Sequence, residues 1–374
     1  MDTVRTDRLI SLDILRGMAV AGMILVNSMS LMSWSAQADV FPLLLHAHWE
    51  GLMLADLVFP AFLFMVGVAI PLSLGLAQGG QGLSGKTGGR IFWRIFRLFV
   101  LGFLLSNIYW MMNFDGSTWR LFGVLQRIAL VYGACAALYL WLGSRWRLGL
   151  IVTILVLYWP LSLVPSPDGV DTDIWVRGQN FVAYVDRFFL GAGEHLYVKG
   201  PQGYDPEGVL GTLPAIAHGL IGVAVGEVLG RRGRGALSGK LFLAGAALLL
   251  IGALWGIVFP VVKDIWSSPF VLVTCGISLC VLALLHRLVD RGPSAAGSVL
   301  GAVFLPFGAN AIAAYVLHIL TASVPGWDVF QQTYTSMAPI IGEGWAAFLP
   351  VLLYLALIWA AMNYLYARRW VIKI

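Results

Sequence analysis

Residues 52–77 read LMLADLVFPAFLFMVGVAIPLSLGLA, an apolar stretch of 26 residues in which Asp56 is the one charged side chain. A helix of about 20 apolar residues is long enough to cross the roughly 30 Å hydrocarbon core of a bilayer. Further stretches of this kind lie at residues 12–34, 91–110, 121–142, 148–164, 209–230, 241–260, 269–286, 299–323 and 345–366. The sequence therefore predicts an all-α membrane protein, a polytopic bundle of about ten transmembrane helices.

The composition supports the same fold class. Hydrophobic residues make up 59% of the 374 residues and charged residues only 11%, whereas soluble domains carry about 25% charged residues. This excludes a disordered chain, a coiled coil and a disulfide-stapled secreted module. The three cysteines all lie in apolar stretches, which argues against disulfides and against a metal site. We expect one transmembrane domain over residues 1–374, with the lipid bilayer as partner and no nucleic acid.

Basic residues are distributed unevenly between the two sides of the predicted bundle. With the N-terminus inside, 18 of the 24 Lys and Arg residues fall at inner helix ends and inner loops. Positive charge concentrates on the cytoplasmic side of membrane proteins, so we predict that both termini are cytoplasmic. The outer side keeps most of the acids and two long segments, residues 35–51 and 165–208. Long loops usually carry function, and an acidic outer face favours a cationic substrate.

The first predicted span places polar side chains along one helix face. Arg16 and Asn27 are eleven residues apart, which is about three turns, or roughly 16 Å along a helix. Asp13 lies three residues before Arg16 and can pair with it. Ionisable groups within spans are costly and usually mark a pathway or a site. An ion pair that only fixes the helix end explains Asp13 and Arg16 equally well.

A second candidate site lies where the outer segment meets the 52–77 span. Asp56 is a buried carboxylate four residues before Pro60, and the nearest partners for it are the histidines upstream. His46 lies in LLLHAHWEG beside an indole, and imidazole is the side chain best suited to proton transfer near neutral pH. We interpret His46 as functional and His48 as structural. A structural role for Asp56 at the proline kink stays open.

Further polar residues gather at the outer ends of later spans and in the outer loops, where we expect contacts with a substrate. They are Trp49, Glu50, Gln126, Arg127, Asp205, Glu207, Lys263, Asn310 and His318. Asp205 and Glu207 directly precede the 209–230 span, so they are also placed to cap that helix.

Several blocks, in order along nearly the whole chain, carry a resemblance to a known family. They are RLISLDILRGMAVAGMILVN, HAHWEGLMLADLVFPAFLFMVG, GVLQRIA, YVDRFFLGAGEHLY, GYDPEGVLGT, KDIWSSPFVL and RRWVIKI. With these blocks the chain resembles the heparan-alpha-glucosaminide N-acetyltransferase family, including its bacterial NagX-type members. The SLDxxRG opening is also similar to the acyltransferase-3 membrane families, but those have a histidine at the position of Asn27, so the first resemblance is nearer.

The resemblance implies transfer of an acetyl group from cytosolic acetyl-CoA, a co-substrate, to the amino group of a terminal glucosamine across the membrane. By the motifs of the family, the catalytic histidine falls on His46 and the active-site asparagine on Asn27, and Asp56 matches as well. Such a transfer needs a base for the amine proton and a donor for the oxyanion. His46 can be the base, oriented by Asp56, and Asn27 the donor. A covalent acetyl-histidine route is equally open.

Acetyl-CoA is confined to the cytosol, so we expect its phosphates to meet the basic inner end of the bundle. A guanidinium group binds phosphate through two parallel hydrogen bonds. The residues that we assign to CoA binding are Arg16, Arg94 and Arg97, with Asp13 beside Arg16. The alternative is that these charges only set the topology.

Two other functions stay open on the sequence. A bundle of this kind with intramembrane polar groups also fits an amino-sugar transporter, although we see no inverted repeat in the sequence. An acyltransferase that modifies another envelope glycan or a muropeptide would share the chemistry. We expect the inner membrane of a bacterium as the location, and a homodimer is an open alternative to a monomer.

Overall fold

The computed structural model is helical, and it describes residues 9–82, 84–113, 119–191, 195–231, 237–290, 298–323 and 327–372. The α-helices are α1 (Ile10–Ser35), α2 (Ala55–Leu74), α3 (Gly85–Ser106), α4 (Ile108–Asn113), α5 (Val124–Trp141), α6 (Ser144–Ser162), α7 (Phe181–Leu190), α8 (Thr212–Arg231), α9 (Leu237–Trp255), α10 (Ser268–Leu288), α11 (Val299–Ala309), α12 (Ala311–Ser323), α13 (Asp328–Ile341) and α14 (Glu343–Ala367). Two short 3-10 helices are η1 (Pro42–Leu44) and η2 (Leu76–Gln78). Within the described residues, sheet pairing is limited to two isolated bridges. The predicted fold class, a helical membrane protein, is confirmed.

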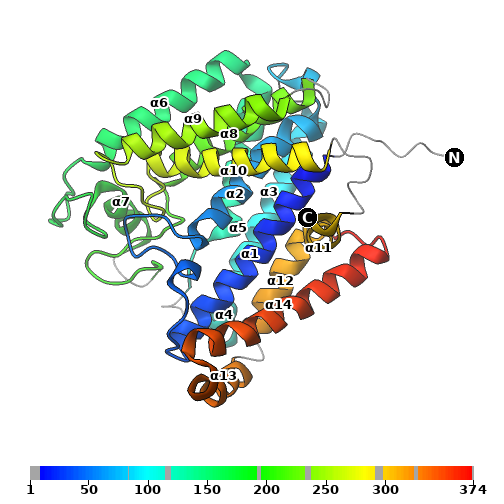
Figure 1. Ribbon diagram of the computed structural model, residues 1–374. Helices are drawn as coiled ribbons and strands as arrows, with labels where there is room; N and C mark the ends of the chain where they lie inside the picture. The colour runs from blue at the N-terminus through cyan, green and yellow to red at the C-terminus, as the bar shows by residue number, and fades with distance from the viewer. Residues whose placement is uncertain are drawn as a thin grey trace.

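The bundle has two different ends. In Figure 1, α7 and the long connecting segments lie on the left, whereas the start of α1 lies on the opposite side. We call the first the loop end, made of residues 36–54, 163–191, 195–211 and 256–267. These segments are joined: the Gly51 N–H donates to the Val261 carbonyl at 2.9 Å, and the Trp49 indole N–H donates to the Ile174 carbonyl at 3.0 Å. We call the opposite end, where α1 and α3 begin, the basic end.

The number of spans differs from the prediction. Seven helices are long and apolar enough to cross a membrane, namely α1, α2, α5, α8, α9, α10 and α14, and the bent pair α11 and α12 makes eight if it is one span. The predicted spans at 91–110 and 148–164 are helical, as α3 and α6, but neither passes that test among the described residues. Basic residues explain the shortfall, because α3 carries Arg90, Arg94 and Arg97, and α6 begins with Arg145 and Arg147.

The span predicted at 299–323 is broken. Its two halves, α11 and α12, meet at an angle of 73°. Asn310 stands at the break with a φ of −120° and a ψ of 39°, outside the helical region. Its amide oxygen accepts the Ile372 N–H at 3.0 Å, so the break holds the segment that follows α14. A hydropathy pattern misses such a break, because both halves are apolar.

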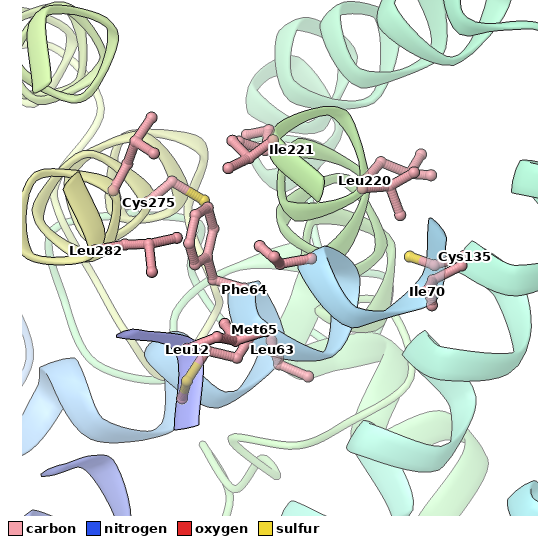
Figure 2. Close-up of a cluster of buried hydrophobic side chains, with 14 of the residues drawn as sticks. Leu12, Leu63, Phe64, Met65, Ile70, Cys135, Leu220, Ile221, Cys275 and Leu282 are labelled. Carbon is pink, nitrogen blue, oxygen red and sulfur yellow. The ribbon is translucent and has the colours of Figure 1, made fainter. Parts of the chain in front are cut away.

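Helix α2 lies at the centre of the bundle. Figure 2 shows Phe64 and Leu63 of α2 in one cluster with Leu220 of α8 and Cys275 of α10. At the crossing of α2 and α8, a Cβ on Gly222 would lie 2.3 Å from the Phe64 carbonyl oxygen, so only glycine allows this approach. Small residues give membrane helices close backbone packing, which is needed where lipid supplies no hydrophobic driving force. The packed crossing fixes α2, which carries residues of the candidate site.

Candidate functional site

A histidine and a carboxylate meet at the start of α2. The His46 Nδ1 lies 2.7 Å from Asp56 Oδ1, while Asp56 Oδ2 accepts the N–H groups of Ala47 and Met53, both at 3.0 Å. The Asp56 side chain is 1% exposed and that of His46 is 41% exposed. With Asp56 ionised, Nδ1 carries the imidazole proton, and Nε2 is left as an accepting nitrogen on the open side of the ring.

A lysine approaches the same carboxylate from another segment. Lys263 Nζ lies 3.5 Å from Asp56 Oδ1. Its loop is fixed on the bundle, because the Tyr158 hydroxyl of α6 donates to the Ile265 carbonyl at 2.6 Å. The Ser267 hydroxyl also donates to the Pro260 carbonyl at 2.8 Å. Asp56 therefore stands between an imidazole and an ammonium group, and the buried charge is balanced.

His46 opens onto a cavity of about 390 Å³, which we call the loop-end cavity. The polar residues that line it come from several helices and loops: Asn27, His46, His48, Arg120, Arg177, Tyr197, Glu207, Lys263, Asp264 and Tyr315. Apolar side chains of α1, α2 and α5 close its inner side, among them Met23, Phe62 and Val124. The cavity thus combines an apolar base with a polar rim that carries charges of both signs.

An ion-pair network forms one wall of the loop-end cavity. Arg120 donates to both oxygens of Asp205, at 2.7 and 2.6 Å, and also to Glu207. Burial lowers the pKa of Arg120, but the two carboxylates outweigh burial and raise it above its ordinary value. For Glu207, burial raises the pKa, but the charges of Arg120, Arg127 and Lys263 together outweigh burial, so the pKa lies below the ordinary value. Arg120 and Glu207 are therefore both charged at neutral pH.

The loop that carries this network is held by Asp186 of α7. Its two oxygens accept the N–H groups of Asp205 and Val209, at 3.2 and 2.9 Å. Burial raises the pKa of Asp186 to about 7. A Cβ on Gly208 would lie 2.1 Å from the Asp186 carboxylate, so a larger residue there would displace the carboxylate from the loop that it holds. Helix α7, which the sequence analysis treated as loop, thus positions Asp205 and its neighbour Glu207.

Two more cavities continue from the loop-end cavity toward the basic end. The middle cavity, of about 390 Å³, shares the lining residues Met23, Phe62, Val124 and Tyr315 with the loop-end cavity. Arg16 and Arg94 line it together with many apolar side chains.

The third cavity, the basic mouth, has a volume of about 760 Å³ and shares Ser73, Arg94 and Tyr132 with the middle cavity. Its lining also includes Lys86, Arg90 and Arg97. The three cavities are therefore neighbours that share lining residues, in order from a cluster of basic residues at one end to His46 at the other.

The structure brings together only part of the sequence-based candidates. Asn27, His46, Glu207 and Lys263 line the loop-end cavity, and Asp56 lies directly behind His46. At the other end, Arg16 and Arg94 line the middle cavity, Arg97 lines the basic mouth, and Asp13 pairs with Arg16 at 3.0 Å.

The remaining candidates lie away from the cavity lining. Asp205 is buried behind Glu207 and binds Arg120 rather than the N-terminus of α8, which begins at Thr212. Glu50 is exposed at the surface. The other five contact neighbouring parts of the protein. Trp49 donates to Ile174, Gln126 donates to Leu121, Arg127 donates to Gly208 and packs over Trp266, Asn310 accepts from Ile372, and His318 contacts Tyr354.

Sequence reasoning missed Arg120, Arg177, Tyr197 and Tyr315. All of them line the loop-end cavity, and His48, interpreted as structural, lines it too. The two arginines belong to the six basic residues that the charge count leaves on the outer side, and nothing in the sequence singles them out. Acids at Asp205 and Glu207 were a signal that a basic partner is needed, but a single sequence does not say which of the outer basic residues it is.

The fold and the site define a class: a polytopic helical membrane protein with a histidine–aspartate pair at one end of a chain of internal cavities. A family model described as "Heparan-alpha-glucosaminide N-acetyltransferase, catalytic" matches residues 8–188, which include Asn27, His46 and Asp56. The chain belongs to the heparan-alpha-glucosaminide N-acetyltransferase family.

Two curated proteins are similar over most of the chain. The heparan-alpha-glucosaminide N-acetyltransferase of Homo sapiens is 30% identical, and the alignment covers 83% of this chain and 52% of the human protein. The Mus musculus protein of the same name is 29% identical, with 83% of this chain and 53% of the mouse protein covered. The chain thus spans about half the length of the curated relatives that it matches.

Proposed function

We propose that the protein is a transmembrane N-acetyltransferase, which moves an acetyl group from cytosolic acetyl-CoA to the amino group of a glucosamine or glucosaminide on the opposite side of the membrane. The observation that carries this proposal is the series of three neighbouring cavities with shared lining residues, from the basic mouth to His46. A donor and an acceptor that are confined to opposite sides of a bilayer need such a connection.

The basic mouth suits the phosphates of CoA. Arg90, Arg94, Arg97 and Lys86 line it, and guanidinium groups bind phosphate through paired hydrogen bonds. Arg94 packs over the Tyr132 ring at 4.4 Å, and its buried Nε has no hydrogen-bond partner among the described residues. The mainly apolar middle cavity suits the extended arm that carries the thioester. The excess of basic residues at this end supports its placement on the cytoplasmic side of the membrane.

The loop-end cavity holds the groups that the chemistry needs. His46 Nε2 takes the amine proton as the new N–C bond forms, and the C–S bond breaks with CoA leaving as a thiolate that takes up a proton. Asp56 holds the imidazole in the required tautomer. Asn27 donates to the carbonyl oxygen as it becomes an oxyanion. A two-step route through an acetyl group on His46 Nε2 uses the same residues.

The acceptor side suits an amino sugar. Glu207 and Asp264 line the loop-end cavity, and carboxylates bind an ammonium group before it loses its proton. Tyr197 lines the same cavity and offers a face for a sugar ring, with Arg120 packed over its ring at 4.5 Å. The segment 165–208, with its acids and aromatic residues, is then the entrance for the acceptor, in the periplasm of a bacterium whose inner membrane holds the protein.

The purified protein in detergent tests the proposal. Incubation with acetyl-CoA and glucosamine is expected to release CoA thiol and to form N-acetylglucosamine in equal amounts, and the release is expected to depend on glucosamine. Lack of both products, together with glucosamine uptake by vesicles that contain the protein, would instead identify a transporter. Acetylation of a muropeptide or another glycan, but not of glucosamine, would keep the chemistry and change the acceptor.

A further inference from the structure

The loop-end cavity and the middle cavity meet at four side chains, which line both of them. They are Met23 of α1, Phe62 of α2, Val124 of α5 and Tyr315 of α12. We call these four side chains the collar. Each of the four is partly exposed and lines both cavities, while Met23, Phe62 and Val124 also pack against the hydrophobic core. A group that passes from one cavity to the other must pass between these side chains.

The collar lies beside the groups that the proposed reaction uses. Met23 precedes Asn27 by four residues, so the two side chains are neighbours on one face of α1. Phe62 follows Asp56 by six residues on α2, which is roughly 9 Å along the helix axis. A thioester that reaches Asn27 from the middle cavity therefore has its carbonyl at the collar, with the acyl chain among these four side chains.

We propose that the collar selects the acyl group by its length, so that it accepts acetyl and rejects longer acyl chains. This inference rests on the proposed acetyl transfer. The side chains around the acyl group are apolar except for the Tyr315 hydroxyl, and a methyl group is suited to such a space. A longer acyl chain must extend either toward the loop end or toward the basic end, and both directions are unfavourable.

Toward the loop end, the cavity lining carries the charges of Arg120, Glu207 and Lys263 beside apolar side chains such as Val58 and Phe59. Apolar atoms placed among these charges remove water from them, which is costly. Toward the basic end, the middle cavity holds the arm of CoA itself. One additional methylene in a closed apolar site changes the specificity constant by about tenfold to two hundredfold.

The test compares acetyl-CoA, propionyl-CoA and butyryl-CoA as donors, with glucosamine as acceptor. For the unmodified protein we expect kcat/KM to fall about tenfold or more with each added methylene. Met23→Ala and Val124→Ala enlarge the collar and are expected to raise the propionyl-to-acetyl ratio of kcat/KM by about tenfold or more. Phe62→Leu is a milder third variant, and size-exclusion chromatography checks the folding of each.

Ile312→Ala is the matched control. Ile312 lies on α12, three residues before Tyr315, and lines the middle cavity but not the loop-end cavity. It is expected to leave the propionyl-to-acetyl ratio unchanged, whatever it does to the KM of the donor. A protein that transfers acetyl, but uses butyryl-CoA equally well, would overturn the inference without any variant. Unchanged ratios in the collar variants would also overturn it, whereas lack of any acetyl transfer would overturn the proposed function instead.

Discussion

The two histidines of the loop-end cavity differ in one respect that decides their chemistry. Both line the cavity, but His46 has its Nδ1 on a buried carboxylate, Asp56 Oδ1, at 2.7 Å. An imidazole held in this way has a fixed tautomer, a fixed orientation and a free Nε2. His48 is exposed and stands beside the same space. The carboxylate therefore marks His46 as the base of the proposed reaction.

Replacement of His46 tests this assignment. His46→Ala is expected to lower kcat by at least about a hundredfold, because general base catalysis contributes roughly a hundredfold to ten thousandfold. The fold is expected to survive, since the His46 side chain is 41% exposed. Transfer to glucosamine and size-exclusion behaviour, both in detergent, are the measurements. His48→Ala is the matched control, and loss of activity in this variant with retention in His46→Ala would assign the base to His48.

Asn27 calls for a different measurement, because an oxyanion donor acts mainly in the transition state. Asn27→Ala is expected to lower kcat by about a hundredfold to a thousandfold and to leave the KM of acetyl-CoA nearly unchanged. Steady-state kinetics with acetyl-CoA as the varied substrate separate the two constants. A parallel rise in KM with unchanged kcat would make Asn27 a binding residue.

At the scale of elements, the crossing of α2 and α8 holds the site on the bundle. The Gly222 Cα faces the backbone of α2, and a Cβ there would lie 2.3 Å from the Phe64 carbonyl oxygen. Backbone atoms do not give way as a flexible side chain does, so a methyl group at this position must push the two helices apart. The movement would shift the start of α2, which carries Asp56.

Gly222→Ala is therefore expected to lower the apparent Tm in detergent, with an overpacking cost of about 1–3 kcal/mol. Gly149→Ala in α6 is the matched control, because a Cβ there meets no heavy atom within 4 Å. The control is expected to be neutral or to stabilise by about 0.5–1 kcal/mol, through the lower chain entropy of alanine. Equal melting curves of the two variants would show that the close crossing of α2 and α8 contributes little to stability.

A comparison of the helices shows which parts of the fold can be predicted from the sequence. Apolar runs predicted the positions of α1, α2, α5, α8, α9, α10 and α14, because length and hydropathy decide a span. They did not predict α7 or α13, nor the break at Asn310, since these depend on tertiary contacts. The His46–Asp56 contact was expected from sequence proximity. The pairing of Arg120 with Asp205 spans 85 residues, and a single sequence holds no signal for a partner so distant.

At the scale of the whole molecule, the side chains that line the cavities change in charge from one end of the bundle to the other. Basic residues line the mouth at one end, and His46, aromatic rings and charged side chains of both signs line the cavity at the other. The middle cavity shares lining residues with each of them and is lined mostly by apolar side chains. This order matches a donor with phosphate groups that enters from the cytoplasm and an amino sugar that enters from the other side.

Arg94 lines both the middle cavity and the basic mouth, so it is placed to hold the donor. Arg94→Ala is expected to raise the KM of acetyl-CoA by about tenfold to a hundredfold and to leave kcat almost unchanged, since one charge-assisted hydrogen bond contributes about 1.5–3 kcal/mol. Arg145→Ala is the control, because Arg145 is exposed at the start of α6 and lies outside the lining of both cavities. An equal effect of both variants would point to a general effect of surface charge.

The central claim is that the acetyl group crosses the membrane inside this protein, and vesicles with the cytoplasmic face outward test it most directly. Acetyl-CoA is added outside, and a membrane-impermeant glucosamine acceptor is either loaded inside or added outside. We predict that external acetyl-CoA is consumed, and N-acetylated acceptor formed, only when the acceptor is inside. Equally fast acetylation of acceptor added outside, with the vesicles intact, would contradict the account, because donor and acceptor would then meet on one side of the membrane.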